Sequence, residues 1–439
     1  MQITISREQF LKPLVQVSGA IERKHTLPIL SNVLLVVENG QLSMTGTDLE
    51  IELVAGVFVG DDIADTKLTL PAKKLLDICK SLPDGSELTL SLQEHQLLLT
   101  SGKSRFSLTT LAAEDFPNLE QWDGEVEFQL TRLELRKLLE STHFSMANQD
   151  VRYYLNGMSF EVDNTDIKTV ATDGHRLAIA QKELGQSLNT QRQLIIPRKG
   201  VQEIMRLMVA DEELVTIQFG ANHIRIIDVE FTFTSKLVDG RFPDYRRVLP
   251  RGGDKVITAN REWLRNAFQR VSILSNEKFR GVRLNLANGL LKITANNPEQ
   301  EEAEEIVEVM YEGDELEIGF NVSYVLDVLN TLKTEDVLFT LADSNSSALI
   351  EGAGDEEGSR VDHAARLPRV SAQGRAAQEG EDGHARQAQE GHFGRPGLPG
   401  GPQGAPRLLQ GGVWRALGRR QRGGQERDLD ARDHDGGLQ

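Results

Sequence analysis

The chain has 439 residues and a formal net charge of −17, with 39% hydrophobic and 26% charged residues. This length corresponds to about three domains of ordinary size, and the composition is that of a globular protein. No apolar run approaches the roughly 18 residues that a membrane-spanning helix needs, the N-terminus lacks a signal-peptide pattern, and a single cysteine excludes an internal disulfide. We therefore expect a cytoplasmic protein with no membrane partner.

Apolar residues at helical spacing predict two helices in each third of the chain. The first kind is expected at residues 7–21, 131–146 and 260–274, and the second at 71–82, 197–208 and 321–333. Alternation of period two predicts strands between them, with hairpin turns at Asn39-Gly40 and Asn288-Gly289. Cys79 lies in the helical segment LLDICKSL without a histidine nearby, which indicates a buried structural thiol rather than a nucleophile.

The chain repeats itself with a period of about 125 residues. Asp48 in TGTDLE and Asp173 in VATDGHRL are 125 residues apart, Asn297 in ITANNPEQ follows 124 residues later, and Phe106 and Phe231 are again 125 apart. Each unit therefore reads as helix, strands, helix, strands, which predicts an α+β fold with helices on one face of antiparallel sheet. We expect three domains, at 1–125, 126–252 and 253–360.

Residues 361–439 differ in composition from the rest of the chain. They contain no Lys, Ile, Thr, Asn, Tyr or Met and are rich in Gly, Arg, Ala, Gln and Pro, so this segment cannot bury enough apolar surface to fold alone. The missing residues have mostly A/T-rich codons, as expected of a GC-rich gene read out of frame. We interpret the tail as a frameshift product; a native disordered tail is the alternative.

Each of the three units carries lysines and arginines on its predicted helices. A negative total charge argues against tight wrapping of nucleic acid, and scattered helical cations usually form a solvated face, but their recurrence in every unit favours contact with DNA phosphates. The helical cations are Arg7, Lys12, Lys73, Lys74, Lys80, Arg132, Arg136, Lys137, Arg198, Lys199, Arg206, Arg261, Arg265 and Arg270.

Two predicted edge strands carry opposite charges. KSRFSL in unit one offers Lys103 and Arg105 beside Phe106 and Leu108, whereas PEQEEAEEIVEV in unit three is acidic. This complementarity favours head-to-tail pairing of two copies, and two such contacts close a ring; a solvated acidic surface is the alternative. The acidic residues are Glu299, Glu301, Glu302, Glu304 and Glu305.

The run ATDGHRL, residues 171–177, looks most like an active site. Its counterparts GTDLEIE and ANNPEQE lack the His and Arg, and no HxxxH or GxSxG pattern occurs. We predict a turn in which Asp173 caps backbone amides and Gly174 takes positive φ; an enzyme that uses Asp173 and His175 is the alternative. Because no GxxxxGK[ST] motif is present either, we expect no cofactor and no metal.

The sequence resembles the DNA polymerase III beta subunit family, the bacterial sliding clamps. The resemblance runs from residue 1 to about 360, through TLPILSN, FSMANQDVRYYLNG, VATDGHRLA, FTSKLVDGRFPDYRRVLP and ILSNEKFRGVRL. It implies a non-catalytic processivity factor of three clamp domains per chain. Two chains would form a closed ring, with helices inside and sheets outside, around double-stranded DNA without reading its sequence. Implied partners are the polymerase alpha subunit, the clamp loader delta subunit, translesion polymerases and repair proteins.

The resemblance also implies roles for individual residues. The implied DNA contacts are Lys24, Gln149, Arg152, Tyr153 and Tyr154, to which the helices add Lys73, Lys80, Arg198 and Lys199. The tyrosines would stack on single-stranded template, or else are strand residues half in the core. Ile273 and Leu274 resemble the apolar plug of the ring joint. The implied peptide-binding pocket comprises Leu155, Thr172, Gly174, His175, Arg176, Leu177, Pro243, Arg247, Val248, Asn321, Tyr324, Asn345 and Ser347.

The chain departs from the family pattern after Arg360, where GSR continues into VDHAARLPRV instead of a short apolar strand. By the repeat, the missing strand corresponds to residues 106–111 and 231–237. In the family that the sequence resembles, each unit's early edge strand pairs with the late strand of a neighbour, which implies that the missing strand would pair with residues 176–180. Several buried side chains at about 1.5–3 kcal/mol each would be lost, against a stability of about 5–15 kcal/mol. We therefore predict impaired stability of unit three and impaired partner binding, unless Val361 and Leu367 fill the gap. A scaffold that cannot close a ring is the alternative function.

Overall fold

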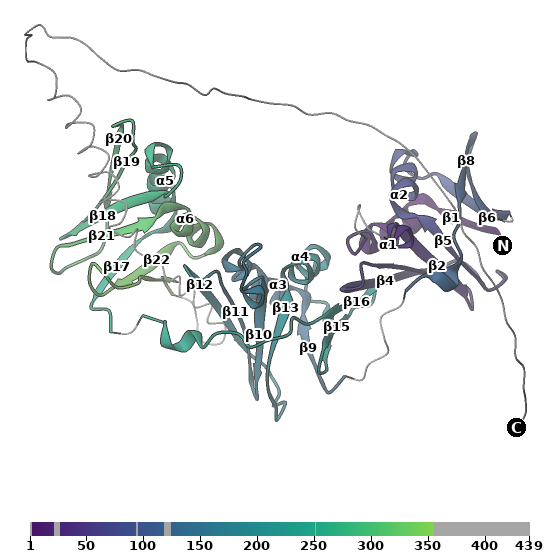
Figure 1. The fold of residues 1–439 in the computed structure, drawn as a ribbon, viewed down its shortest axis with the longest axis horizontal. Coiled ribbons are helices and arrows are strands. Elements are labelled where there is room, and N and C mark those ends of the chain that lie inside the picture. Colours follow the sequence, from purple (N-terminus) through teal and green to yellow (C-terminus); the bar gives the residue numbers. More distant parts are fainter. Residues whose placement is uncertain (1, 22–26, 94, 118–123, 251, 355–439) are drawn as a thin grey trace, which may run out of the picture. The chain divides into compact units, whose positions relative to one another are not determined.

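The computed structural model describes residues 2–21, 27–93, 95–117, 124–250 and 252–354 (Figure 1). Three consecutive segments share one order of elements, which confirms the triplication. The first repeat contains β1 (Gln2–Ser6), α1 (Arg7–Val17), β2 (Asn32–Glu38), β3 (Gln41–Thr47), β4 (Ile51–Phe58), β5 (Thr66–Pro71), α2 (Ala72–Ser81), β6 (Glu87–Gln93), β7 (Gln96–Ser101) and β8 (Ser104–Thr109). Lys24, Val361, Leu367 and the whole segment 361–439 lie outside the described residues.

The second and third repeats follow the same order, except that the described part of the third ends one strand early. The second contains β9 (Val126–Thr131), α3 (Arg132–Glu140), β10 (Gly157–Asp163), β11 (Asp166–Thr172), β12 (Leu177–Glu183), β13 (Gln191–Pro197), α4 (Arg198–Leu207), β14 (Leu214–Phe219), β15 (His223–Ile227) and β16 (Phe231–Lys236). The third contains β17 (Lys255–Asn260), α5 (Arg261–Val271), β18 (Gly281–Ala287), β19 (Leu290–Asn296), β20 (Glu302–Glu308), β21 (Leu316–Asn321), α6 (Val322–Thr331), β22 (Asp336–Leu341) and β23 (Leu349–Gly352).

Every repeat contributes two antiparallel sheets, and its two helices pack against each other (Figure 1). The sheets have the orders β1-β6-β7-β8, β12-β11-β10-β13, β20-β19-β18-β21 and, within the described residues, β17-β22-β23. The remaining sheet, β5-β2-β3-β4-β16-β15-β14-β9, has eight strands because β16 of the second repeat pairs with β4 of the first, from Phe231 opposite Ala55 to Ser235 opposite Ile51. One intramolecular joint is therefore a continuous sheet.

The expectation that each repeat opens with a helix is wrong, because a short strand comes first. The last residue of that strand is also the helix N-cap: the side chain of Ser6 accepts from the amide of Gln9, and Thr131 forms a capping box with Glu134. The opening helices also end earlier than predicted, at Val17, Glu140 and Val271. After Glu140 and Val271 the apolar pattern continues into single 3-10 turns, which explains the overestimate.

An arginine occupies the first position of each opening helix and fastens it to the rest of its repeat. Arg7 Nε donates to the carbonyl of Cys79 (2.8 Å), and Arg261 Nε donates to the carbonyl of Thr334 (2.8 Å). Arg132 forms two bonds to the fully buried carboxylate of Asp228, at 2.6 and 2.7 Å. These three helical cations are therefore structural, and the prediction that the helical cations as a set face DNA is too broad.

The Asn-Gly turns and the cysteine are close to expectation. Asn39 and Gly40 both have positive φ, at 50° and 74°, as a type I′ hairpin turn requires, whereas only Gly289 does so in the second hairpin. Cys79 is fully buried, and desolvation raises the pKa of its thiol to about 12. Its interpretation as a structural thiol is confirmed.

Within the described part of the chain, no helix has the length and apolar character to cross a membrane.

Candidate functional site

The ATDGHRL turn connects β11 to β12, and its acidic residue is a backbone cap. Asp173 Oδ1 accepts from the amides of His175 (2.8 Å) and Arg176 (2.9 Å), while Gly174 has a φ of 86°. Asp48 does the same in the first repeat, where its Oδ1 accepts from the amides of Glu50 and Ile51 at 2.8 Å each. The predicted turn is confirmed, and the Asp belongs to the architecture of the repeat.

His175 lies exposed at the tip of this turn. Its imidazole makes no hydrogen bond to another described residue, so nothing in that part of the chain orients the ring as a general base needs. The arrangement therefore suits contact with a docked ligand better than proton transfer.

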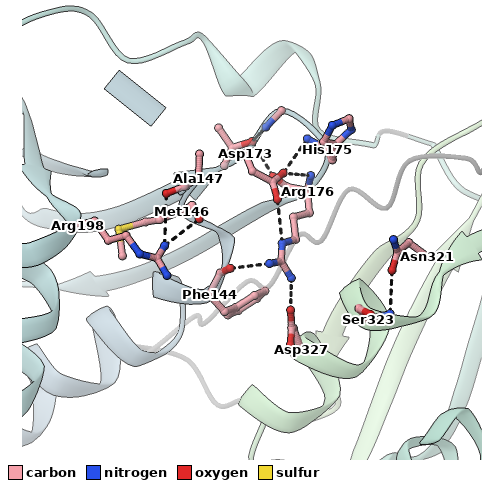
Figure 2. A network of polar contacts seen from close by, with 12 residues as sticks. Phe144, Met146, Ala147, Asp173, His175, Arg176, Arg198, Asn321, Ser323 and Asp327 are labelled. Carbon is pink, nitrogen blue, oxygen red and sulfur yellow. Dashed lines mark hydrogen bonds and ion pairs between the residues drawn. The ribbon is translucent and has the colours of Figure 1, made fainter. Parts of the chain in front are cut away.

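Arg176 reaches from the same turn to α6 of the third repeat (Figure 2). Its guanidinium donates to Asp173 Oδ2 (3.2 Å), to the carbonyl of Phe144 (2.8 Å) and to the carboxylate of Asp327. The guanidinium carbon lies 4.6 Å from the ring centre of Tyr324 and 5.4 Å from that of Phe144. Phe144 and Asp327 are missing from the sequence-predicted set, because nothing local in the sequence pairs them with Arg176.

A cleft with a volume of about 280 Å³ lies between the segment after β16 and the β22–β23 loop. It is lined by Arg247, Val248, Pro250, Gly253, Thr340, Ala342, Asn345, Ser346 and Ser347. Four predicted pocket residues, Arg247, Val248, Asn345 and Ser347, are therefore brought together. The remaining predicted residues are not part of its lining.

The wall of the cleft that carries Arg247 and Val248 is held in place by a buried hydrogen bond. Tyr245, in the 3-10 turn Tyr245–Arg247, donates its hydroxyl to Glu161 Oε2 at 3.1 Å, and both side chains are buried. Burial, and secondarily the Glu161 charge, raises the pKa of Tyr245 to about 12. The hydroxyl therefore stays a donor at neutral pH and fixes this wall.

The other predicted pocket residues lie in three different settings. Leu155 and Leu177 are buried, and Pro243 is exposed on the segment after β16. Thr172 accepts from the amide of Gly174 at 3.0 Å within the turn. Asn321 caps α6 by accepting from the amide of Ser323 at 2.9 Å (Figure 2).

Comparison with known proteins decides the family. Sequence profiles of the DNA polymerase III beta subunit match most of the described chain: the N-terminal domain at residues 1–120, the central domain at 129–244 and the C-terminal domain at 246–364. The chain belongs to the bacterial sliding clamp family.

Curated beta sliding clamps are similar over nearly their whole length. The clamp of Proteus mirabilis is 58% identical over 352 residues, which cover 80% of this chain and 96% of the relative. That of Escherichia coli K12 is 55% identical over 361 residues, covering 82% and 98%. A crystal structure of the Pseudomonas aeruginosa clamp bound to griselimycin has a TM-score of 0.80 at 55% identity, covering 84% of this chain and all of that one. The C. crescentus clamp reaches 0.79 at 36% identity, covering 84% of this chain and 99% of its own.

The proposed DNA-binding residues of this clamp divide into free and engaged cations. Lys73 and Lys80 on α2 are exposed and have no ion pair with any described residue. Arg198 instead donates to the carbonyl of Met146 (3.0 Å), and Lys199 bonds the carboxylate of Asp48, whose side chain is only 4% exposed. Arg198 and Lys199 therefore stabilise the fold in this state, whereas Lys73 and Lys80 are available.

Arg152 lies at the ATDGHRL turn. It bonds both carboxylate oxygens of Asp150 (3.0 and 2.8 Å) and the carbonyl of Asp173 (3.1 Å), and its guanidinium packs over Gly174, where a Cβ would lie 2.9 Å from the nearest nitrogen. The Arg152 guanidinium lowers the pKa of Asp150 to about 2. Arg152 thus lies beside the proposed pocket residues as well as in the proposed DNA-binding set.

The alternative that Tyr153 and Tyr154 are strand residues is wrong, because both lie in the 3-10 turn Tyr153–Leu155. Tyr153 is 57% exposed, whereas Tyr154 packs on a buried cluster and meets Tyr153 edge-on, with ring centres 5.8 Å apart. Gln149 is exposed nearby with a φ of 57°. Tyr153 is therefore the tyrosine that is free to stack on a base.

The residues expected at the ring joint lie on or just before the edge strands β8 and β20, and just after α5. Lys103 and Arg105 are exposed and Phe106 is half-buried, but Leu108 is buried in the core of its own repeat. Ile273 is 75% exposed and Leu274 half-buried.

Two carboxylates of the acidic edge are paired within their own repeat. Arg270 holds Glu305 through two bonds of 2.6 and 2.8 Å, and Lys292 holds Glu304 at 2.6 Å. Glu301 accepts from Asn297, while Glu299 and Glu302 are exposed. The charge available for a second copy is therefore smaller than the sequence suggests.

Proposed function

We propose that two copies of this clamp close head-to-tail around double-stranded DNA and act in the cytoplasm as the processivity factor of DNA polymerase III. Replication proteins would dock in the cleft beside the ATDGHRL turn. The proposed partners are the polymerase alpha subunit, the clamp loader delta subunit, translesion polymerases and repair proteins. The chain would supply attachment and no catalysis, in keeping with its family.

The β4–β16 ladder carries this proposal. In the repeat, β8 is the counterpart of β16 and β20 the counterpart of β4, and both β8 and β20 are outermost strands of their described sheets. A β8–β20 ladder between two copies would repeat the geometry that already joins the first two repeats. Because the contact is heterologous, two copies related by a two-fold axis make it twice and close.

Free lysines on the helices support the DNA part of the proposal. Lys74 and Lys80 on α2 and Lys137 on α3 are exposed and form no ion pair with a described residue. Long, unpaired cations attract phosphates without fixing their position, which suits a ring that must slide.

The experiment is the mass of the purified chain in solution together with its retention on DNA. We expect a dimer, and retention at raised salt on circular DNA but not on linear DNA, because only a closed ring is trapped by topology. Arg105→Glu should weaken the dimer, whereas Lys67→Glu, a charge reversal of the same size on the outermost strand β5, should not. A monomer bound equally to linear and circular DNA would favour the open scaffold.

A second experiment separates docking from catalysis. His175→Ala should reduce binding of griselimycin, the compound bound by the P. aeruginosa clamp, and leave the dimer intact. Loss of turnover on some substrate in this variant would instead support an enzyme.

A further inference from the structure

Among the described residues, the contacts between the second and third repeats differ in kind from those between the first and second. The first joint contains the five-pair β4–β16 ladder. At the second, no strand ladder links the two repeats within the described residues. Phe144 of the second repeat packs on the core of the third, and Leu349 of the third packs on a cluster of the second that includes Leu177. Side chains, rather than backbone pairing, hold this part of the joint.

Arg176 is the polar centre of the joint. Its side chain is only 12% exposed, and the guanidinium is shared among Asp173, the carbonyl of Phe144 and Asp327 while lying against two aromatic rings. An arginine has five N–H donors in a planar fork. Three of these five donors are engaged, and only 12% of the side chain is exposed, so a ligand has little access to the remaining two.

We propose that Arg176 is a positioning residue that ties the ATDGHRL turn to α6, so that the shape of the docking site depends on the joint between the second and third repeats. The turn presents Gly174 and His175 to solvent, and α6 presents Asp327 from the other repeat (Figure 2). This inference rests on the proposed docking site and specifies how that site is held.

The direction of the effect follows from the hydrogen bonds. Asp173 Oδ1 accepts from the two amides of the turn, and Oδ2 accepts from the guanidinium of Arg176. Removing the Asp327 carboxylate leaves the guanidinium with one anionic partner fewer and leaves the ring of Tyr324 as its remaining contact on α6, so the turn is held less firmly. A looser turn must be ordered again when a ligand binds, so ligand affinity should fall.

The chain contains a matched control for Asp327. The sequence LLDICKS of α2 is the counterpart of VLDVLNT of α6, and Asp77 takes the same position in its helix as Asp327. Asp77 is exposed and bonds no described residue. Asp77→Asn therefore removes the same charge from the same helix position without touching an arginine.

The tie is tested first without a ligand, by amide hydrogen exchange on the full-length chain. In Asp327→Asn and in Arg176→Ala, we expect the amides of His175 and Arg176 to exchange about tenfold faster than in the unmodified chain, the change that corresponds to about 1.4 kcal/mol. Asp77→Asn should leave them unchanged. Unchanged exchange in Asp327→Asn would refute the tie whatever the docking site does.

The effect on docking is tested by calorimetric titration with griselimycin. Arg176→Ala and Asp327→Ala should each raise Kd about tenfold, and the double variant should bind no worse than either, because the two residues act as one unit. Arg176→Lys, which keeps the charge but not the fork, should fall between. If Arg176→Ala weakens binding while Asp327→Ala leaves it unchanged or tightens it, Arg176 contacts the ligand itself and the proposal is wrong. Failure of the unmodified chain to bind griselimycin would refute the proposed docking site. The hydrogen-exchange result would still show whether Arg176 ties the turn to α6.

Discussion

Removing the free helical lysines should lower the salt dependence of DNA binding more than removing engaged ones. The test variant is Lys80→Ala with Lys137→Ala, since both side chains are exposed and have no ion pair in the described structure. Each phosphate contact contributes about 0.9 to the slope of log K against log salt. Four lysines in a dimer would therefore contribute up to about 3.6, which is about 150-fold in affinity between 50 and 200 mM salt.

The assay is fluorescence anisotropy of a labelled duplex over that salt range. Lys199→Ala is the control. The ammonium of Lys199 already bonds Asp48, so its removal takes away no cation that is free to bind a phosphate. That control should lower the melting temperature instead, since it leaves the nearly buried carboxylate of Asp48 unpaired. An unchanged slope in the Lys80/Lys137 variant, or an equal change in the control, would refute the division into free and engaged cations.

Three further predictions concern stability. Arg132→Met should destabilise the second repeat by about 3–5 kcal/mol in urea unfolding, since it leaves the fully buried carboxylate of Asp228 without its cation. Adding Asp228→Asn should recover part of the lost stability. The Cys79 thiol, with its pKa raised to about 12, should resist thiol reagents in the native state. Because the unfolded thiol loses its proton first, the contribution of this thiol to stability should be complete below pH 9 and vanish towards pH 12. Cys79→Ala should not show this loss. Replacing residues 361–439 by an apolar strand like β16, where Phe231 and Phe233 are buried, should raise stability by about 3–6 kcal/mol and strengthen griselimycin binding, and equal values in both chains would contradict the predicted impairment.

The repeat and its capping turns could be predicted from the sequence, because they depend on residues that are close together. Asp173 caps amides two and three residues away, and the period places Asp48 in the same role. The opening strands could not be predicted, since each is five or six residues long and runs into its helix without a turn. QITIS alternates in burial, but Ser6 at its end already caps α1.

The sequence indicated which residue types gather at the site but not which of them pair. Arg176 and Asp327 are 151 residues apart, and Lys199 and Asp48 are also 151 apart. Neither pair leaves a local pattern. The sequence therefore counts Lys199 among the helical cations expected at DNA, and it gives no sign that Arg176 has a partner on α6.

These two long-range pairs reveal a rule of the joints. In each, the turn after the third strand of one repeat contacts the second helix of the next: Asp48 meets Lys199 on α4, and Arg176 meets Asp327 on α6. Lys73 is the counterpart of Lys199 on α2, and the corresponding turn of the third repeat contains Asn297 and Glu301, which bond each other.

If the ring joint follows the same rule, Lys73 of one copy should meet Glu301 of the other and contribute to closure rather than to DNA binding. Lys73→Glu and Glu301→Lys should each weaken the dimer in analytical ultracentrifugation, and the two variants combined should dimerise better than either. Exposed pairs contribute about 0.2–1 kcal/mol, so an effect of a few fold per joint is expected, doubled in free energy because the ring contains two joints. If Lys73→Glu instead leaves the dimer intact and lowers the salt slope of DNA binding, Lys73 faces the duplex and the third joint departs from the rule of the other two.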